Sequence, residues 1–254
     1  MARLQLPSRP PERLRKAADP AVARVPPAPR RLIRPDQKIR LRRLGVLAAL
    51  VAVLLVFWQS VALLPLRLVV VTFHELGHAA MAWVTGGEVV EVMVGMDEGG
   101  RTVTRGGDPV LILNGGYLGS LVAGLAMLWF LELPGGARTV AGVLGGALSI
   151  VAVRWFTVSG TGFGLVLVTG VLLIGVATRS PEWLVEWAVR LVGWFSIIYA
   201  LVDLRADVFA AGGAGVLSDA AQLEGLTSVP AVFWGFGWLV AGLFFVWAMG
   251  RRLV

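Results

Sequence analysis

Long apolar stretches constrain the fold of this chain more than any other feature. Several of them approach or exceed the roughly 20 residues that a helix needs to cross a lipid bilayer. Of the 254 residues, 57% are hydrophobic and 15% are charged, which is less charge than a soluble domain of this size carries. We therefore expect an all-α polytopic membrane protein.

Proline and glycine residues divide the apolar stretches into six or seven predicted transmembrane helices. Pro65 breaks the first stretch, and Pro134-Gly135-Gly136 and a glycine-rich segment at 211–215 separate later ones. The helices are predicted over residues 44–63, 66–85 and 109–131, as two helices within 139–178, and over about 181–202 and 232–249.

Residues 88–105 have a different pattern and predict a small β-hairpin between two of the membrane helices. Valines at alternating positions come first, then the turn sequence Asp97-Glu98-Gly99-Gly100, and then the short strand 101–104. An exposed edge of this hairpin could pair with an extended substrate segment. The alternative is a plain connection between two helices.

Charge separates the first 43 residues from the rest of the chain. They contain 13 Lys and Arg against 3 Asp and Glu, whereas the other 211 residues contain 10 and 13. The segment is also rich in proline and lacks apolar periodicity. We therefore predict a disordered, basic Pro/Arg-rich tail at 1–43, followed by an integral membrane domain at 44–254.

The basic tail also predicts the orientation and surroundings of the protein. Positive segments stay on the cytoplasmic side, so we expect a cytoplasmic N-terminus near anionic lipid. We expect no nucleic-acid partner, because the tail has no folded or aromatic support for one. The many Ala, Gly, Val and Arg residues, with two lysines, are typical of a GC-rich bacterial genome, which favours a bacterial plasma membrane.

The two histidines of the chain, His74 and His78, both lie in the sequence HELGH within the helix predicted over 66–85. Helical residues four apart face the same way, so the two imidazoles can share one zinc ion. Glu75 lies beside the first ligand, where it can take a proton from a metal-activated water molecule. It can later pass this proton to the leaving amine of a cleaved peptide bond.

The depth of these residues in the bilayer supports a common role for them. Arg67 marks the expected interface, and His74 lies roughly 10 Å further along the helix. Ionisable groups at such depth are costly unless they have a partner, and a metal ion provides one. The alternative is a chance HExxH sequence whose histidines bond to backbone carbonyls.

Zinc needs a third protein ligand, and with no cysteine and no further histidine it must be a carboxylate. Asp203 is the preferred candidate, because it follows an apolar helix that begins after Arg190. Its alternative role is a helix-end charge paired with Arg205. Asp219 is the alternative metal ligand, although its place after Ser218 also suits the start of a helix.

The segment 114–120, with the sequence NGGYLGS, lies in the third predicted span. Its glycines Gly115 and Gly119 are typical of close helix packing. Asn114 and Ser120 are candidates for oxyanion or substrate contacts. The alternative is that both side chains serve helix packing alone.

The sequence Phe73-His74-Glu75-Leu76-Gly77-His78-Ala79, followed by Thr85-Gly86-Gly87, resembles the site-2 protease family of intramembrane zinc metallopeptidases, in its bacterial branch. The resemblance extends through the hairpin to Gly116–Ser120, which fits the family's GxxxN/S/G motif. The family's later Asp ligand lies in a Pro-rich LDG motif. Val202-Asp203-Leu204 occupies the corresponding place, without the prolines or the following glycine.

The resemblance implies a zinc-dependent intramembrane endopeptidase, whose partners are transmembrane protein substrates in regulated intramembrane proteolysis. The residues alone imply metal-assisted hydrolysis inside a membrane. Two alternatives stay open at this point. The irregular sequence around Asp203 would suit an inactive metal-binding scaffold, and intramembrane charges can also line the pathway of a transporter.

Overall fold

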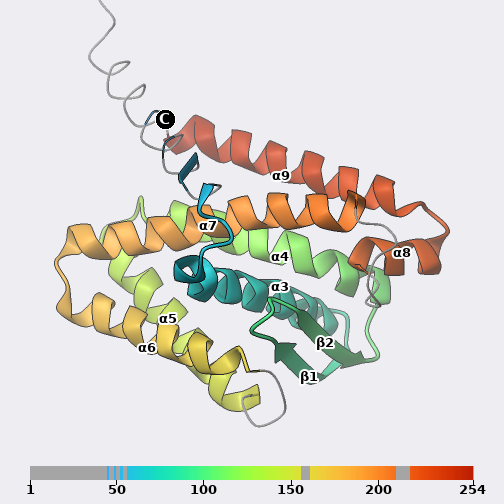
Figure 1. The fold of residues 1–254 in the computed structure, drawn as a ribbon, viewed down its shortest axis with the longest axis horizontal. Coiled ribbons are helices and arrows are strands. Elements are labelled where there is room, and N and C mark those ends of the chain that lie inside the picture. The colour runs from blue at the N-terminus through green and yellow to red at the C-terminus, as the bar shows by residue number, and fades with distance from the viewer. Residues whose placement is uncertain are drawn as a thin grey trace, which may run out of the picture. The chain divides into compact units, whose positions relative to one another are not determined.

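The computed structural model describes residues 45, 49, 52–53, 56–155, 161–209 and 218–253, with backbone alone at 155, 203–209, 246 and 249–253. The predicted tail at 1–43 and the glycine-rich segment at 211–215 lie outside the described residues. Within these limits the chain is mostly helical and contains one two-stranded sheet (Figure 1).

The described elements follow the order expected from the sequence. The predicted hairpin and the division of 139–178 into two helices are confirmed. After a short 3-10 helix at Val61–Leu63, the elements are α3 (Leu64–Val84), β1 (Glu88–Val94), β2 (Gly100–Arg105), α4 (Pro109–Phe130), α5 (Gly136–Trp155), α6 (Phe163–Arg179), α7 (Glu182–Phe209), α8 (Asp219–Thr227) and α9 (Ala231–Leu253).

Four helical segments in the described part of the chain are long and apolar enough to cross a membrane. They are Val61–Val84, Pro109–Phe130, Gly136–Arg154 and Glu182–Val202, and two shorter apolar helices occur at Phe163–Arg179 and Ala231–Phe245. The chain is therefore an integral membrane protein, as expected. The number of spans, six or seven, stays a prediction.

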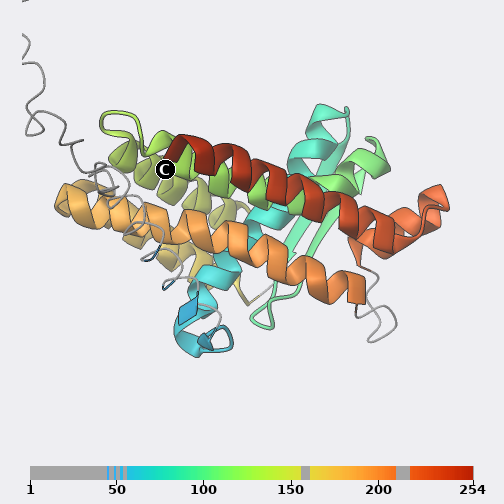
Figure 2. The same ribbon diagram turned by 90° about the horizontal axis from the view of Figure 1, so that it is seen from above.

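Helix α3 occupies the centre of the helical arrangement. It packs against α4, α6 and α7 and against both strands, while α5 and α6 form a neighbouring pair. Both views place α9 alongside α7 and α4 (Figures 1 and 2). Pro65 lies in the first turn of α3, where its missing N–H costs no helical hydrogen bond.

Glycines bring the backbones of α3 and α4 into direct contact. A Cβ atom at Gly77 would overlap the carbonyl oxygen of Gly115, and one at Gly119 would lie 2.7 Å from the Cα of Gly77. Larger residues would force the helices apart. This contact agrees with the interpretation of Gly115 and Gly119 as small residues that allow close helix packing.

The hairpin is attached to α3 at its turn. Strands β1 and β2 pair antiparallel, with Val92 opposite Thr102, and Val92 is fully buried. At the turn, Glu98 lies 2.9 Å from the Nε atom of Arg67. The Arg67 side chain is buried within the protein, where it also donates to the carbonyls of Trp58 and Ser60. Its place at the membrane interface stays a prediction.

Candidate metal centre

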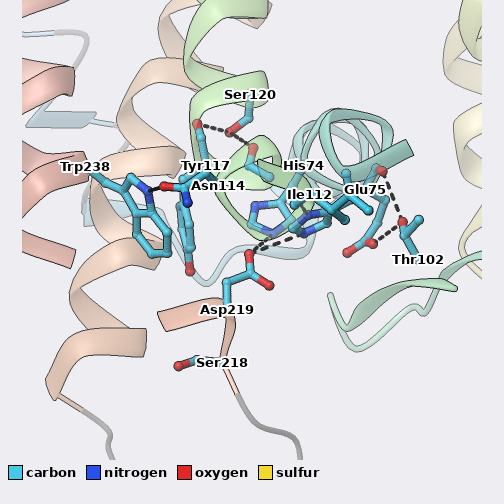
Figure 3. Close-up of polar contacts among 12 residues, drawn as sticks. His74, Glu75, Thr102, Ile112, Asn114, Tyr117, Ser120, Ser218, Asp219 and Trp238 are labelled. Atoms are coloured by element: carbon cyan, nitrogen blue, oxygen red, sulfur yellow. Dashed lines mark hydrogen bonds and ion pairs between the residues drawn. The ribbon is translucent and has the colours of Figure 1, made fainter. Parts of the chain in front are cut away.

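Three side chains from two distant parts of the sequence meet at one point beside α3. The Nε2 atoms of His74 and His78 lie 3.1 and 3.2 Å from the same Oδ2 atom of Asp219. All three potential ligand atoms lie within 4.8 Å of one another. Figure 3 shows the imidazole ring of His74 turned toward the Asp219 carboxylate.

The separations suit a single bound metal ion. Two ligand atoms about 2.0–2.1 Å from one tetrahedral zinc lie about 3.3 Å from each other, close to both histidine–aspartate distances. Two imidazoles and one carboxylate are a ligand set that zinc accepts, and they leave a fourth position open. The residues present therefore fit a zinc ion.

A backbone contact orients the second histidine. The Nδ1 atom of His78 lies 2.7 Å from the carbonyl oxygen of Ile112. Because a carbonyl oxygen only accepts, Nδ1 carries the proton in this contact. The Nε2 atom is then the unprotonated nitrogen, which is the form that binds a metal.

Gly116 in α4 makes the space in which the two imidazoles approach each other. A Cβ atom on this residue would lie 2.5 Å from the Nε2 atom of His74 and 2.6 Å from that of His78. These separations are shorter than any ordinary contact. The glycine in this turn of α4 is therefore part of the site as well as of the helix packing.

Asp219 reaches the histidines from the first turn of α8. Ser218 caps this helix, and its hydroxyl accepts a hydrogen bond from the N–H of Ala221, so the expected start of a helix at this point is confirmed. Burial opposes ionisation of Asp219, but the contacts of its carboxylate with the two imidazoles outweigh it and hold the pKa of this carboxyl well below its usual value.

A cluster of apolar side chains holds α8 against α4 and α9. Its buried members are Tyr117, Ala220, Leu223 and Trp238. The rings of Tyr117 and Trp238 lie 4.8 Å apart, and Tyr117 meets the ring of His74 edge-on at 4.7 Å. Through Tyr117, the apolar cluster that holds α8 therefore also contacts a histidine of the candidate metal centre.

The sequence favoured Asp203 as the third ligand. This residue belongs to helix α7, which continues beyond it to Phe209. Its side chain is outside the part of the chain described in atomic detail, so its ligand role stays a prediction. The structure brings the alternative candidate, Asp219, to the two histidines.

Glu75 lies on the same helix, with its carboxylate held by the hairpin. The hydroxyl of Thr102 in β2 lies 2.6 Å from Oε2 of Glu75 and 3.0 Å from the carbonyl oxygen of the same residue. The Glu75 side chain is buried, with 4% of the residue exposed. The sequence pattern predicted the strand but gave no signal that Thr102 would meet Glu75.

Asn114 and Ser120 make contacts within the helix packing. Asn114 donates to the carbonyl of Val110 and accepts a hydrogen bond from the indole N–H of Trp238, at 2.8 and 2.7 Å. The hydroxyl of Ser120 donates toward carbonyls of its own helix, the nearer being that of Tyr117 at 3.1 Å. A contact of either side chain with substrate or oxyanion stays a prediction.

Comparison with known protein families identifies a relationship that covers most of the chain. A family model described as Peptidase M50B-like matches residues 47–249 of the chain, which include every residue of the candidate metal centre. Neither the curated proteins nor the solved structures contain a match.

Proposed function

Because the chain belongs to the Peptidase M50B-like family, within the site-2 protease group of membrane metallopeptidases, we propose that it is a zinc-dependent intramembrane endopeptidase. The observation that carries this proposal is the convergence of His74, His78 and Asp219 next to the carboxylate of Glu75. The three residues would hold the metal, and Glu75 would move protons.

Zinc, when bound, would supply the Lewis acidity that allows a water molecule to lose a proton near neutral pH. Glu75 takes that proton as the water oxygen attacks the carbonyl carbon of the peptide bond. It then delivers the proton to the amide nitrogen as the carbon–nitrogen bond breaks, so that one acid and one amine are released. The position of Glu75 next to His74 suits this transfer.

The membrane position of the site supports a substrate that is itself embedded in the bilayer. His74, Glu75 and His78 lie on α3, one of the four helices long and apolar enough to span. Water is scarce at that depth, and polar groups there must be paired. Transmembrane proteins are therefore the proposed substrates, in the manner of regulated intramembrane proteolysis. We also propose that the protein lies in a bacterial plasma membrane with its own N-terminus in the cytoplasm.

Substitution of Glu75 tests this function. The purified protein, reconstituted in liposomes with a mixed pool of single-span peptides, is expected to release products that disappear with a chelator and with Glu75→Gln. Glu132→Gln, at an exposed glutamate after α4, serves as the matched control and should cleave normally. Products unaffected by Glu75→Gln would contradict the proposed role of Glu75. No products at all would contradict the proposal and favour an inactive metal-binding scaffold.

A further inference from the structure

Strand β2 lies directly against the carboxylate of Glu75, and two of its residues meet the two oxygens separately. The hydroxyl of Thr102 lies 2.6 Å from Oε2, and a Cβ atom at Gly100 would overlap Oε1. Resting on the proposed function, we propose that Thr102 is a positioning residue that holds the catalytic carboxylate of Glu75, and that Gly100 leaves the space the carboxylate needs.

The pleat of the strand explains why these two residues act together. Alternate residues of a strand point to the same face, so Gly100 and Thr102 both face α3. Arg101 between them points away, has a mostly exposed side chain, and lies 3.4 Å from Glu91 on the neighbouring strand. One face of β2 thus contacts Glu75, and the other carries the exposed, charged side chain of Arg101.

Hydrogen-bond chemistry gives Thr102 a defined effect on Glu75. A threonine hydroxyl has one proton to donate, and it has two acceptors on Glu75, the carboxylate Oε2 at 2.6 Å and the backbone carbonyl at 3.0 Å. When Glu75 is ionised, as its proposed role as a proton acceptor requires, the bond to its carboxylate is the shorter and stronger one, so the proton goes to Oε2. This bond fixes one oxygen of a long side chain, while Oε1 lies against Gly100 and takes no part in the bond.

The hairpin that carries Thr102 is itself fixed in place. Val92, opposite Thr102, and Val94, opposite Gly100, are both fully buried. The turn is tied to the start of α3 by the ion pair between Glu98 and the buried Arg67. Because the strand is anchored at its turn and by the buried residues that pair with it, Thr102 can hold the carboxylate in a fixed position.

The first test is kinetic and uses three variants of the full chain. For one peptide cleaved by the wild type, Thr102→Val should lower kcat about 10- to 100-fold, the loss expected from a misplaced catalytic group, with KM within about twofold. Thr102→Ser keeps the hydroxyl and should restore most of the activity. Thr104→Val, the same change one pleat further along β2, is the matched control and should behave as wild type.

The second test is a stability cycle that needs no catalysis. Without metal and in detergent, Thr102→Val should lower the Tm by about 2–4 °C, as expected for loss of one buried hydrogen bond. In a Glu75→Ala background the same substitution should change the Tm by much less, because the partner is already missing. Zinc content should match the wild type in Thr102→Val, since no ligand is altered.

The two tests separate failure of this inference from failure of the proposed function. An active wild type whose kcat is unchanged by Thr102→Val, or whose loss is not rescued by Thr102→Ser, would overturn the positioning role alone. Equal Tm changes with and without Glu75 would overturn the contact itself. A wild type with no metal-dependent cleavage would overturn the proposed function, and the positioning role with it, even if the coupling in Tm is present.

Discussion

At the scale of single residues, the candidate metal centre depends on a position without a side chain as well as on the side chains that meet there. The imidazoles of His74 and His78 meet Asp219 because Gly116 has no Cβ atom to separate them from α4. The Nδ1 contact of His78 with Ile112 then directs Nε2 to the centre. A small change in volume at this glycine should therefore act like loss of a ligand.

Gly116→Ala tests this volume requirement. The added methyl group would lie within 2.6 Å of both imidazoles, so we expect zinc affinity to fall by at least about tenfold, the range seen when the surroundings of metal ligands are disturbed. Competition with a fluorescent zinc chelator measures the affinity.

Gly142→Ala in α5 is the matched control, because a Cβ atom there would meet nothing within 4 Å. It should leave zinc affinity unchanged and raise helix stability by up to about 1 kcal/mol. Equal affinities in the two variants would contradict the steric role of Gly116.

At the scale of elements, the site combines residues from two helices, α3 and α8, which pack against different neighbours. The helix α3 supplies the histidines and is held by α4, while α8 supplies Asp219 and is held by its contacts with α4 and α9. Trp238 joins α9 to α4 through its bond to Asn114. Metal affinity should therefore depend on residues that never touch the metal.

Trp238→Phe tests this support of α8. The variant keeps an aromatic ring against Tyr117 but removes the hydrogen bond to Asn114, which is worth about 1 kcal/mol. We expect zinc affinity to fall up to about fivefold, because Asp219 is held less firmly. Trp187→Phe, at an exposed tryptophan in α7, should not change it, and a similar fall in both variants would rule out this link.

The sequence predicted some parts of this arrangement for clear physical reasons. The pairing of His74 with His78 follows from helical spacing, and the hairpin follows from alternation and a turn, both of which are local. The positions of Asp219 and Thr102 depend on how segments far apart in the sequence pack together. Local sequence patterns carry no information about such packing. Apolar run length favoured Asp203, whereas Asp219 follows a serine cap, a pattern that is equally common in purely structural helices.

At the scale of the whole molecule, the metal should stabilise the folded chain. A ligand that binds only the folded state adds about 2.7 kcal/mol at a concentration one hundred times its Kd. For a chain of this size we therefore expect zinc to raise the Tm by about 5–10 °C, measured by thermal unfolding in detergent with zinc or with a chelator. Glu75→Gln should keep this shift, because Glu75 is not a ligand. No shift in the wild type would contradict a structural contribution from the metal.

The zinc content of purified variants tests the central claim most directly, because the site proposed here uses Asp219 beside His74 and His78. Element analysis should find about one zinc per chain in the wild type and in Asp203→Ala, and a large loss in Asp219→Ala. Full zinc in Asp219→Ala together with loss in Asp203→Ala would contradict the account and place the third ligand in α7.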